Sequence, residues 1–328
     1  MVLAIVFTLI KILIIVVCTL IGVAYMTYAE RKVIGHMQVR LGPSHVGPKG
    51  LLQPLADGLK LFAKEDVTPD MVDKPVFYVA PFLGMVPGLA AFAVIPFADE
   101  MTLFGMKVQP YVSDINVGLL YILALSSVGV YGIIMSGWAS NSKYSTMGSL
   151  RSTAQVISYE TSMGLSLIGP VLLAGSLSLK GITDAQAGMW FVVPQFVAFV
   201  IFVISAVAET NRAPFDLPEA ETEIVSGFHT EYSSMRFAMF FLGEYANMWV
   251  IACVCAIMFL GGYNGPLLPP LVWFFIKVLA FMFLYLWLRA TLPRLRYDQL
   301  MNLGWKILIP IALANLLITS IIVYAVRN

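Results

Sequence analysis

The chain has 328 residues, of which 59% are hydrophobic and 12% are charged, and its formal net charge at pH 7 is +1. Soluble domains carry about 25% charged and about 45–50% apolar residues, so this composition excludes an ordinary soluble globular protein. The near-zero net charge also leaves no basic excess that would favour binding to nucleic acid.

Long continuous apolar runs predict an all-α integral membrane protein rather than the short alternating strands of an outer-membrane barrel. A helix needs roughly 20 apolar residues to cross a hydrocarbon core of about 30 Å. Eight runs reach that length, and together they predict a single membrane domain over residues 1–328, with spans at 3–27, 76–97, 114–139, 155–178, 189–208, 235–260, 268–290 and 303–326.

The basic residues predict the orientation of these spans. Fifteen of the 20 lysines and arginines lie within or beside four segments, 28–75, 140–154, 209–234 and 291–302. By the positive-inside rule these segments face the cytoplasm or matrix, and both termini lie on the outer (periplasmic) side. Lys11 and Lys277 lie inside spans, where a long side chain can reach toward the outer interface. The sequence assigns neither lysine a function.

A second kind of helix is predicted directly after the first span. Residues 51–64, LLQPLADGLKLFAK, place leucines and Phe62 on one face and Gln53, Asp57 and two lysines on the other. About 14 residues are too few to cross a bilayer, so this amphipathic helix is expected to lie along the membrane surface. It is either a lipid-facing anchor, or a roof whose polar face covers a cavity or docks a partner.

Acidic side chains within the spans are the strongest functional signal from the residues themselves. A charged group inside a membrane is costly, by about 2.5–3.5 kcal/mol on insertion scales, so each one suggests a partner or a proton role. Glu160 and Glu244 lie at comparable depths in their spans, and Glu209 closes the span 189–208. The two glutamates in the spans therefore form either a structural pair or part of a proton path.

The connection after Glu209 is the densest acidic stretch of the chain. Closely spaced carboxylates cannot all ionise cheaply, and carboxyl groups that hold protons near neutrality are suited to a proton relay. A solvated loop or a docking face is the alternative. The acids of this stretch are Asp216, Glu219, Glu221, Glu223 and Glu231.

Nothing in the sequence predicts a redox centre or a metal site. The three cysteines, Cys18, Cys253 and Cys255, lie in apolar runs and form no CxxC pair. The three histidines lie outside every apolar run, so no histidine pair within the bilayer could hold a haem.

Two long motifs carry a family resemblance, and three short ones accompany them. The long motifs are GLLQPLADGLKLFAKE at 50–65 and PFDLPEAETEIVSGFHTEY at 214–232; the short ones are AERK at 29–32, QVISYE at 155–160 and RLRYDQLM at 294–301. Over nearly its whole length the chain resembles membrane subunit 1, the H-type subunit, of the proton-pumping NADH:quinone oxidoreductase (respiratory complex I).

The resemblance implies an enzyme subunit without a redox centre of its own. Such a subunit joins the hydrophilic arm to the membrane arm and forms much of the quinone chamber and its entrance. It implies a quinone-binding role for Arg31, Arg40, Asp57, Phe228 and Arg212. It implies a proton path through Glu160, Glu209, Asp216, Glu219, Glu221, Glu223 and Glu244.

The resemblance also implies cofactors, partners and a location. The substrate would be ubiquinone or menaquinone, with FMN and iron–sulfur clusters held by partner subunits. The partners would be the quinone-site hydrophilic subunits, neighbouring membrane-arm subunits and membrane lipid. A bacterial inner membrane is expected, with the mitochondrial inner membrane as the alternative.

Two other functions stay open on the sequence. Related membrane subunits occur in energy-converting hydrogenases and in other complexes that do not use NADH. A stand-alone proton or cation transporter would also contain acids inside the membrane, although no internal repeat of equal halves supports it.

Overall fold

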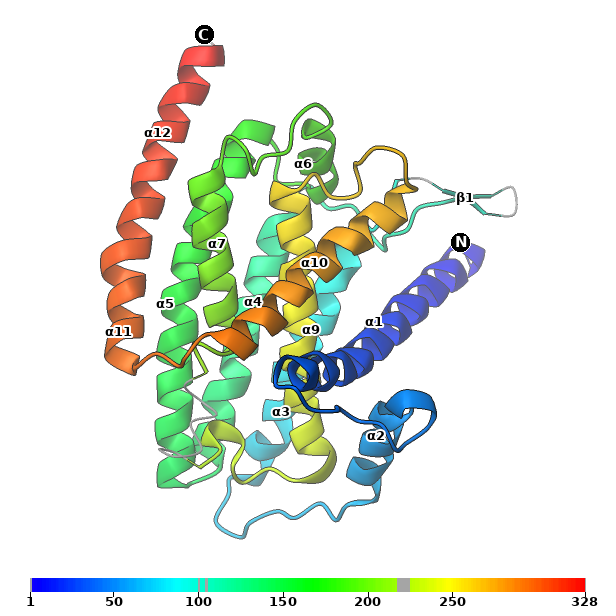
Figure 1. The fold of residues 1–328 in the computed structure, drawn as a ribbon, viewed down its shortest axis with the longest axis vertical. Coiled ribbons are helices and arrows are strands. Elements are labelled where there is room, and N and C mark those ends of the chain that lie inside the picture. Colours follow the sequence, from blue (N-terminus) through cyan, green and yellow to red (C-terminus); the bar gives the residue numbers. More distant parts are fainter. Residues whose placement is uncertain (1, 100, 104–105, 217–224, 328) are drawn as a thin grey trace.

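Long apolar helices make up most of the chain (Figure 1). The structure, a computed structural model, describes residues 2–99, 101–103, 106–216 and 225–327. In chain order the helices and strands are α1 (Val2–Met37), η1 (Pro48–Gly50), α2 (Gln53–Ala63), α3 (Lys74–Ala91), η2 (Phe92–Val94), β1 (Met101–Leu103), β2 (Met106–Val108), α4 (Gly118–Ala139), α5 (Lys143–Ala174), α6 (Leu179–Ala185), α7 (Phe196–Glu209), η3 (Gly227–His229), α9 (Ser234–Phe259), α10 (Pro270–Thr291), α11 (Tyr297–Asn302), the π-helical turn η4 (Leu303–Leu308) and α12 (Ile309–Arg327).

Seven of the helices in the described part of the chain are long and apolar enough to cross a membrane. The eighth predicted span, 189–208, corresponds to α7, which has only 14 residues and is therefore about 21 Å long. Residues 191–195 form turns instead of helix. Pro194 lies in those turns, and a proline disfavours helical backbone at the residue before it. The all-α prediction also missed the short antiparallel pair β1 and β2.

The helices form a bundle crossed by two oblique helices (Figure 1). α3, α4, α5, α7 and α9 run side by side, whereas α1 and α10 cross them at an angle. The connection between α2 and α3 lies at one end of the bundle, and α6 and the C-terminus lie at the other. Most of the fully buried side chains come from α9 and the helices packed around it.

Three glycines allow three helices to meet closely. A Cβ atom on Gly132 of α4 would lie 2.6 Å from the backbone nitrogen of Gly84 in α3. A Cβ atom on Gly243 of α9 would lie 2.5 Å from the carbonyl oxygen of the same Gly84. Small residues let membrane helices approach to backbone contact. This crossing therefore fixes α4 and α9 against the two sides of α3.

Replacing Gly132 by Ala is expected to destabilise the bundle by about 1–3 kcal/mol, the usual cost of overpacking. The added methyl group meets backbone atoms of α3, which cannot rotate away as a side chain can. Thermal unfolding of the purified protein in detergent measures the loss. Gly164→Ala in α5 is the matched control, because its Cβ would meet nothing within 4 Å. Equal unfolding temperatures for the two variants would contradict the close helix crossing.

Polar side chains of α5 hold the chain that follows α7. The Gln155 side-chain amide donates to the carbonyl oxygens of Ala208 (2.7 Å) and Phe215 (2.8 Å). The hydroxyl groups of Ser162 and Ser205 lie 2.7 Å apart and join α5 to α7. These bonds fix the end of α7 and the start of the acidic connection relative to α5.

Lys277 of α10 belongs to a polar cluster that ties α10 to the connection before it. Its side chain is only 5% exposed and donates to the carbonyl oxygens of Gly262 (2.8 Å) and Asn264 (2.7 Å). The Tyr263 hydroxyl in the same connection donates to Asp184 at 2.9 Å. Burial raises the pKa of the Tyr263 phenol, and the bond to Asp184 raises it further. Lys277 therefore binds carbonyl groups of this connection, and whether the connection lies at the outer interface stays a prediction.

The predicted amphipathic helix is confirmed as α2. Its apolar side chains point away from the rest of the chain, with Leu55 62%, Leu59 70% and Phe62 71% exposed. The Asp57 side chain accepts hydrogen bonds from Arg31 of α1 and from Gln53. The polar face of α2 is thus attached to α1. Its placement along a membrane surface stays a prediction.

Candidate functional site

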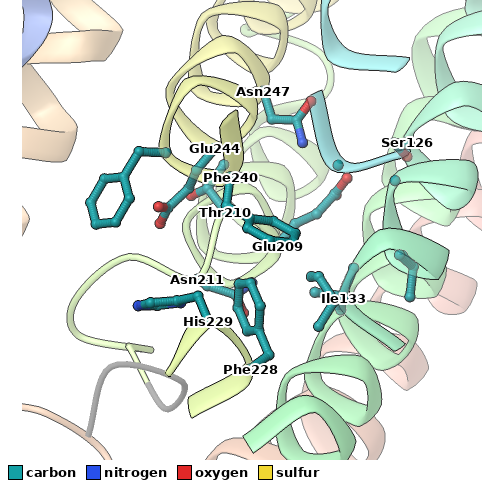
Figure 2. A pocket seen from close by; sticks show the side chains of 15 residues that line it. Ser126, Ile133, Glu209, Thr210, Asn211, Phe228, His229, Phe240, Glu244 and Asn247 are labelled. Atoms are coloured by element: carbon teal, nitrogen blue, oxygen red, sulfur yellow. The ribbon is translucent and has the colours of Figure 1, made fainter. Parts of the chain in front are cut away.

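A polar cavity of about 80 Å³ lies where α3, α4, α5, α9 and the chain after α7 meet. Figure 2 shows side chains from these elements converging on it. Its lining includes three aromatic side chains, Phe228, Phe240 and Phe241. Its polar lining residues are Ser126, Glu209, Thr210, Asn211, His229, Glu244 and Asn247. The cavity therefore combines aromatic surface with groups that can bind or transfer protons.

Glu209, the last residue of α7, is the central acid of this cavity. In Figure 2 it lies between Glu244 and Ser126. Its Oε2 atom is buried and has no hydrogen-bond partner in the described part of the chain. The Oδ1 atom of Asn211 is buried in the same way. Buried polar atoms without partners in the chain itself are candidates to bind water or another ligand.

A second, smaller cavity continues from the first into the bundle. It has a volume of about 30 Å³, and Ser126, Glu209 and Asn247 line it as well. The rest of its lining is mainly apolar and includes Leu167 and Phe202. The three shared residues thus stand where the polar cavity gives way to the apolar interior.

Ser126 of α4 connects two carboxyl groups. Its hydroxyl lies 3.2 Å from Oε1 of Glu160 on α5, and Ser126 lines both cavities together with Glu209. Glu160 accepts a second hydrogen bond from the neighbouring Ser127. A hydroxyl group can donate and accept at once, so Glu160, Ser126 and Glu209 form a chain along which a proton could pass.

Arg212 occupies the centre of a charged cluster beside the cavity. Its Nε atom lies 3.2 Å from Glu244 Oε1, and its Nη1 atom lies 3.8 Å from Glu30 Oε1. The guanidinium group also stacks 4.2 Å from the centroid of the Tyr245 ring. Glu30 in turn accepts hydrogen bonds from Tyr245 (2.7 Å) and from Arg289. The cluster joins α1, α9 and α10 to the chain that follows α7.

The structure separates the predicted quinone-binding residues into two places. Phe228 lines the cavity and Arg212 lies beside it. Arg31 and Asp57 instead form an ion pair of 2.7 Å between α1 and α2, with 54% of the Arg31 side chain exposed. Arg40 is exposed in the turn after α1. None of these contacts tests whether the five residues bind quinone, so that role stays a prediction.

The predicted proton-path acids also have different surroundings. Glu209 and Glu244 line the cavity, and Glu160 joins it through Ser126. Asp216 is 8% exposed and lies 3.6 Å from Arg294 Nη2. Three further predicted acids, Glu219, Glu221 and Glu223, lie outside the described residues.

Sequence analysis did not assign six residues of this region to the functional site. Glu30 was noted only as part of the AERK motif at 29–32, and no role was assigned to it. Arg289 counted only as a marker of orientation. The one available signal for Glu30 was its position at the end of an apolar run. That position did not identify Arg212 and Arg289 as its partners. The residues missed are Glu30, Ser126, His229, Tyr245, Asn247 and Arg289.

The comparisons with known proteins identify the family. The family model described as NADH dehydrogenase matches residues 10–320. A relative from Geobacter metallireducens, the first of its H-type subunits of NADH-quinone oxidoreductase, is 59% identical over 297 residues, which cover 90% of each chain. The chain belongs to the family of H-type subunits of NADH-quinone oxidoreductase. The resemblance expected from the two long motifs is thereby confirmed.

Two further relatives of the same type match nearly the full length. The first H-type subunit of Geobacter sulfurreducens is 54% identical and covers 95% of this chain and 94% of its own. The H-type subunit of Paramagnetospirillum magneticum is 55% identical and covers 96% of this chain and 92% of its own. As a member of this family, the chain is one subunit of an enzyme complex and a multi-pass membrane protein.

Proposed function

We propose that this chain is the membrane subunit through which an NADH-quinone oxidoreductase couples quinone reduction to proton translocation. The observation that carries the proposal is the cavity in which Phe228, Glu209 and Glu244 meet, because it joins aromatic side chains to a chain of carboxyl groups. The names of the relatives supply the reaction. They also favour the quinone enzyme over the hydrogenase and transporter alternatives.

The chain supplies one part of the quinone site, and partner subunits supply the rest. Ligand pockets usually have volumes of about 300–1,000 Å³, whereas the cavity here measures about 80 Å³. The cavity is thus the end of a larger chamber that closes only when the hydrophilic subunits are in place. Phe228 offers a flat apolar surface to a quinone ring, and Arg212 holds the carboxylates beside it.

Entry from the bilayer would follow the polar side of α2. The Arg31–Asp57 pair lies between α1 and α2, close to the lipid-facing leucines of α2. A guanidinium group donates hydrogen bonds in fixed directions and stays charged at every relevant pH. Arg31 and the exposed Arg40 would therefore orient the polar ring of a quinone while its apolar tail remains in lipid.

Proton coupling would begin at Glu209. Reduction of a quinone to a quinol takes up protons and changes the charge at the chamber. Carboxyl groups that are buried and close to one another hold protons more readily than carboxyl groups in water. Glu209, Ser126 and Glu160 could pass that charge change from the cavity toward α5. Asp216, Glu219, Glu221, Glu223 and Glu244 would extend the path at the chamber side.

Other features of the proposal come from the family. Ubiquinone or menaquinone would be the substrate, and partner subunits would hold FMN and the iron–sulfur clusters. Bacterial relatives and the apolar helices support a bacterial inner membrane. The single membrane domain, eight crossings and outer termini are part of the same proposal.

Photolabelling of the native membrane complex with a quinone analogue tests the quinone site. We expect labelled peptides around Phe228 or between Arg31 and Asp57, and loss of the label when a quinone-site inhibitor is added. Peptides of α12, which borders neither the cavity nor α2, serve as the internal control. Inhibitor-sensitive label that is absent from this chain, in a complex that still oxidises its donor, would refute a quinone site here.

A further inference from the structure

A large apolar groove lies on the side of the molecule away from the polar cavity. Its volume is about 580 Å³, within the range of about 300–1,000 Å³ typical of ligand pockets. Residues of α1, η2, α9 and α10, together with the chain after β2, line it. Figure 1 shows α1 and α10 crossing the bundle obliquely in this region. The groove shares no lining residue with the candidate quinone site.

One end of the groove carries a charged group, and the rest of its lining is mainly apolar. Lys11, Gln109 and Tyr111 supply its polar groups at the end near the chain after β2. Toward the middle of α1 the lining is mainly apolar and ends at Gly22 and at Trp249, whose buried Nε1 atom has no hydrogen-bond partner in the described residues. This order of polarity matches a molecule with a polar head and a hydrocarbon tail.

The groove follows about three turns of α1. Lys11 and Gly22 are eleven residues apart on a continuous helix, which corresponds to about 16 Å at 1.5 Å per residue. A hydrocarbon core is about 30 Å thick, so this stretch is long enough to hold a substantial part of one acyl chain. An acyl chain whose head group lies at Lys11 would thus follow α1 as far as Gly22.

The positive charge of Lys11 favours a bound molecule whose polar head group is negatively charged. Within the described part of the chain its ammonium group lies 5.5 Å from the centroid of the Phe7 ring and forms no ion pair. A lysine inside an apolar span is costly unless a counter-charge or water reaches it. A lipid phosphate at the polar end of the groove would provide that counter-charge.

We propose that this groove binds one anionic phospholipid, with its phosphate on Lys11 and one acyl chain between α1 and α10. The site is separate from the proposed quinone chemistry and does not depend on it. A lipid held there would fill the space between α1 and the bundle and would fix the slope of α1.

Photoactivatable lipids test the proposal on the purified native complex that contains this chain. Phosphatidylglycerol and phosphatidylcholine with the same diazirine-bearing acyl chain are incorporated in turn, and the labelled peptides are mapped. We expect phosphatidylglycerol to label residues 14–22 or the Trp249 peptide about five times more strongly than phosphatidylcholine, since one lysine contributes about that factor for an anionic lipid.

Two variants and a control distinguish the effect of the Lys11 charge from the effect of the free volume in the groove. Lys11→Gln should reduce labelling by phosphatidylglycerol to the level of phosphatidylcholine. Cys18→Trp, which places a bulky ring at a residue that lines the groove, should remove labelling by both lipids. Lys306→Gln at an exposed position before α12 should change neither. Equal labelling by the two lipids in the wild type would overturn the proposal. Crosslinks between groove residues and another subunit would also overturn the proposal. Loss of the lipid label when a quinone is added would overturn it as well.

Discussion

Replacing Glu209 by Gln is expected to lower coupled quinone reduction about 10²-fold, the lower end of what a positioned proton-transfer group contributes. Glutamine keeps the size and the polar end of the side chain but cannot exchange a proton. Glu209 lines both cavities together with Ser126, and Ser126 donates to Glu160. Its loss should therefore interrupt proton transfer without removing a packing contact.

The measurement is NADH-driven quinone reduction in membrane vesicles, with the pH gradient recorded in parallel. Glu160→Gln should produce a loss of the same kind, since both acids belong to one chain. Glu231→Gln is the matched control, because Glu231 belongs to the same connection as Asp216 but does not line the cavity. Donor oxidation by an artificial acceptor should be unchanged in all three variants. A Glu209→Gln complex with full turnover and a full pH gradient would exclude Glu209 from the proton path.

The membrane helices were predictable because each contains its own signal. A run of apolar residues long enough to cross the bilayer is visible within a single segment, and seven such helices are found in the described chain. The eighth prediction was less accurate because hydropathy does not register the turns around Pro194, which delay α7 until Phe196. Amphipathic spacing similarly predicted α2 within two residues of its ends.

The site was only partly predictable because its contacts join distant segments. Arg289 and Glu30 are 259 residues apart in the sequence, and no spacing rule relates them. Glu160 and Glu244 were expected to lie at similar depth, either as a pair or within a proton path. In the structure Glu160 accepts from two serines of α4 and Glu244 faces Arg212. The acids were visible in the sequence, but their partners depended on how α4 and α9 pack on α3.

Replacing Arg212 by Met is expected to destabilise the assembled protein by about 3–5 kcal/mol, the usual cost of removing one member of a buried ion pair. The Arg212 side chain is 5% exposed, and the carboxylates of Glu30 and Glu244 are 10% and 23% exposed. Methionine fills similar space but leaves Glu244 without this charged partner. Thermal dissociation of the complex on native gels measures the loss.

The control and the double variant decide whether the loss is electrostatic. Arg296→Met removes an arginine from an exposed pair with Asp298, where both side chains are more than 70% exposed, and should cost less than about 1 kcal/mol. Arg212→Met combined with Glu244→Gln should recover part of the stability, because the side chain that loses the Arg212 charge is then neutral. A double variant as unstable as the single one would attribute the effect to packing against Tyr245. In that case Arg212 would be a structural residue, and Glu244 would hold its charge without it.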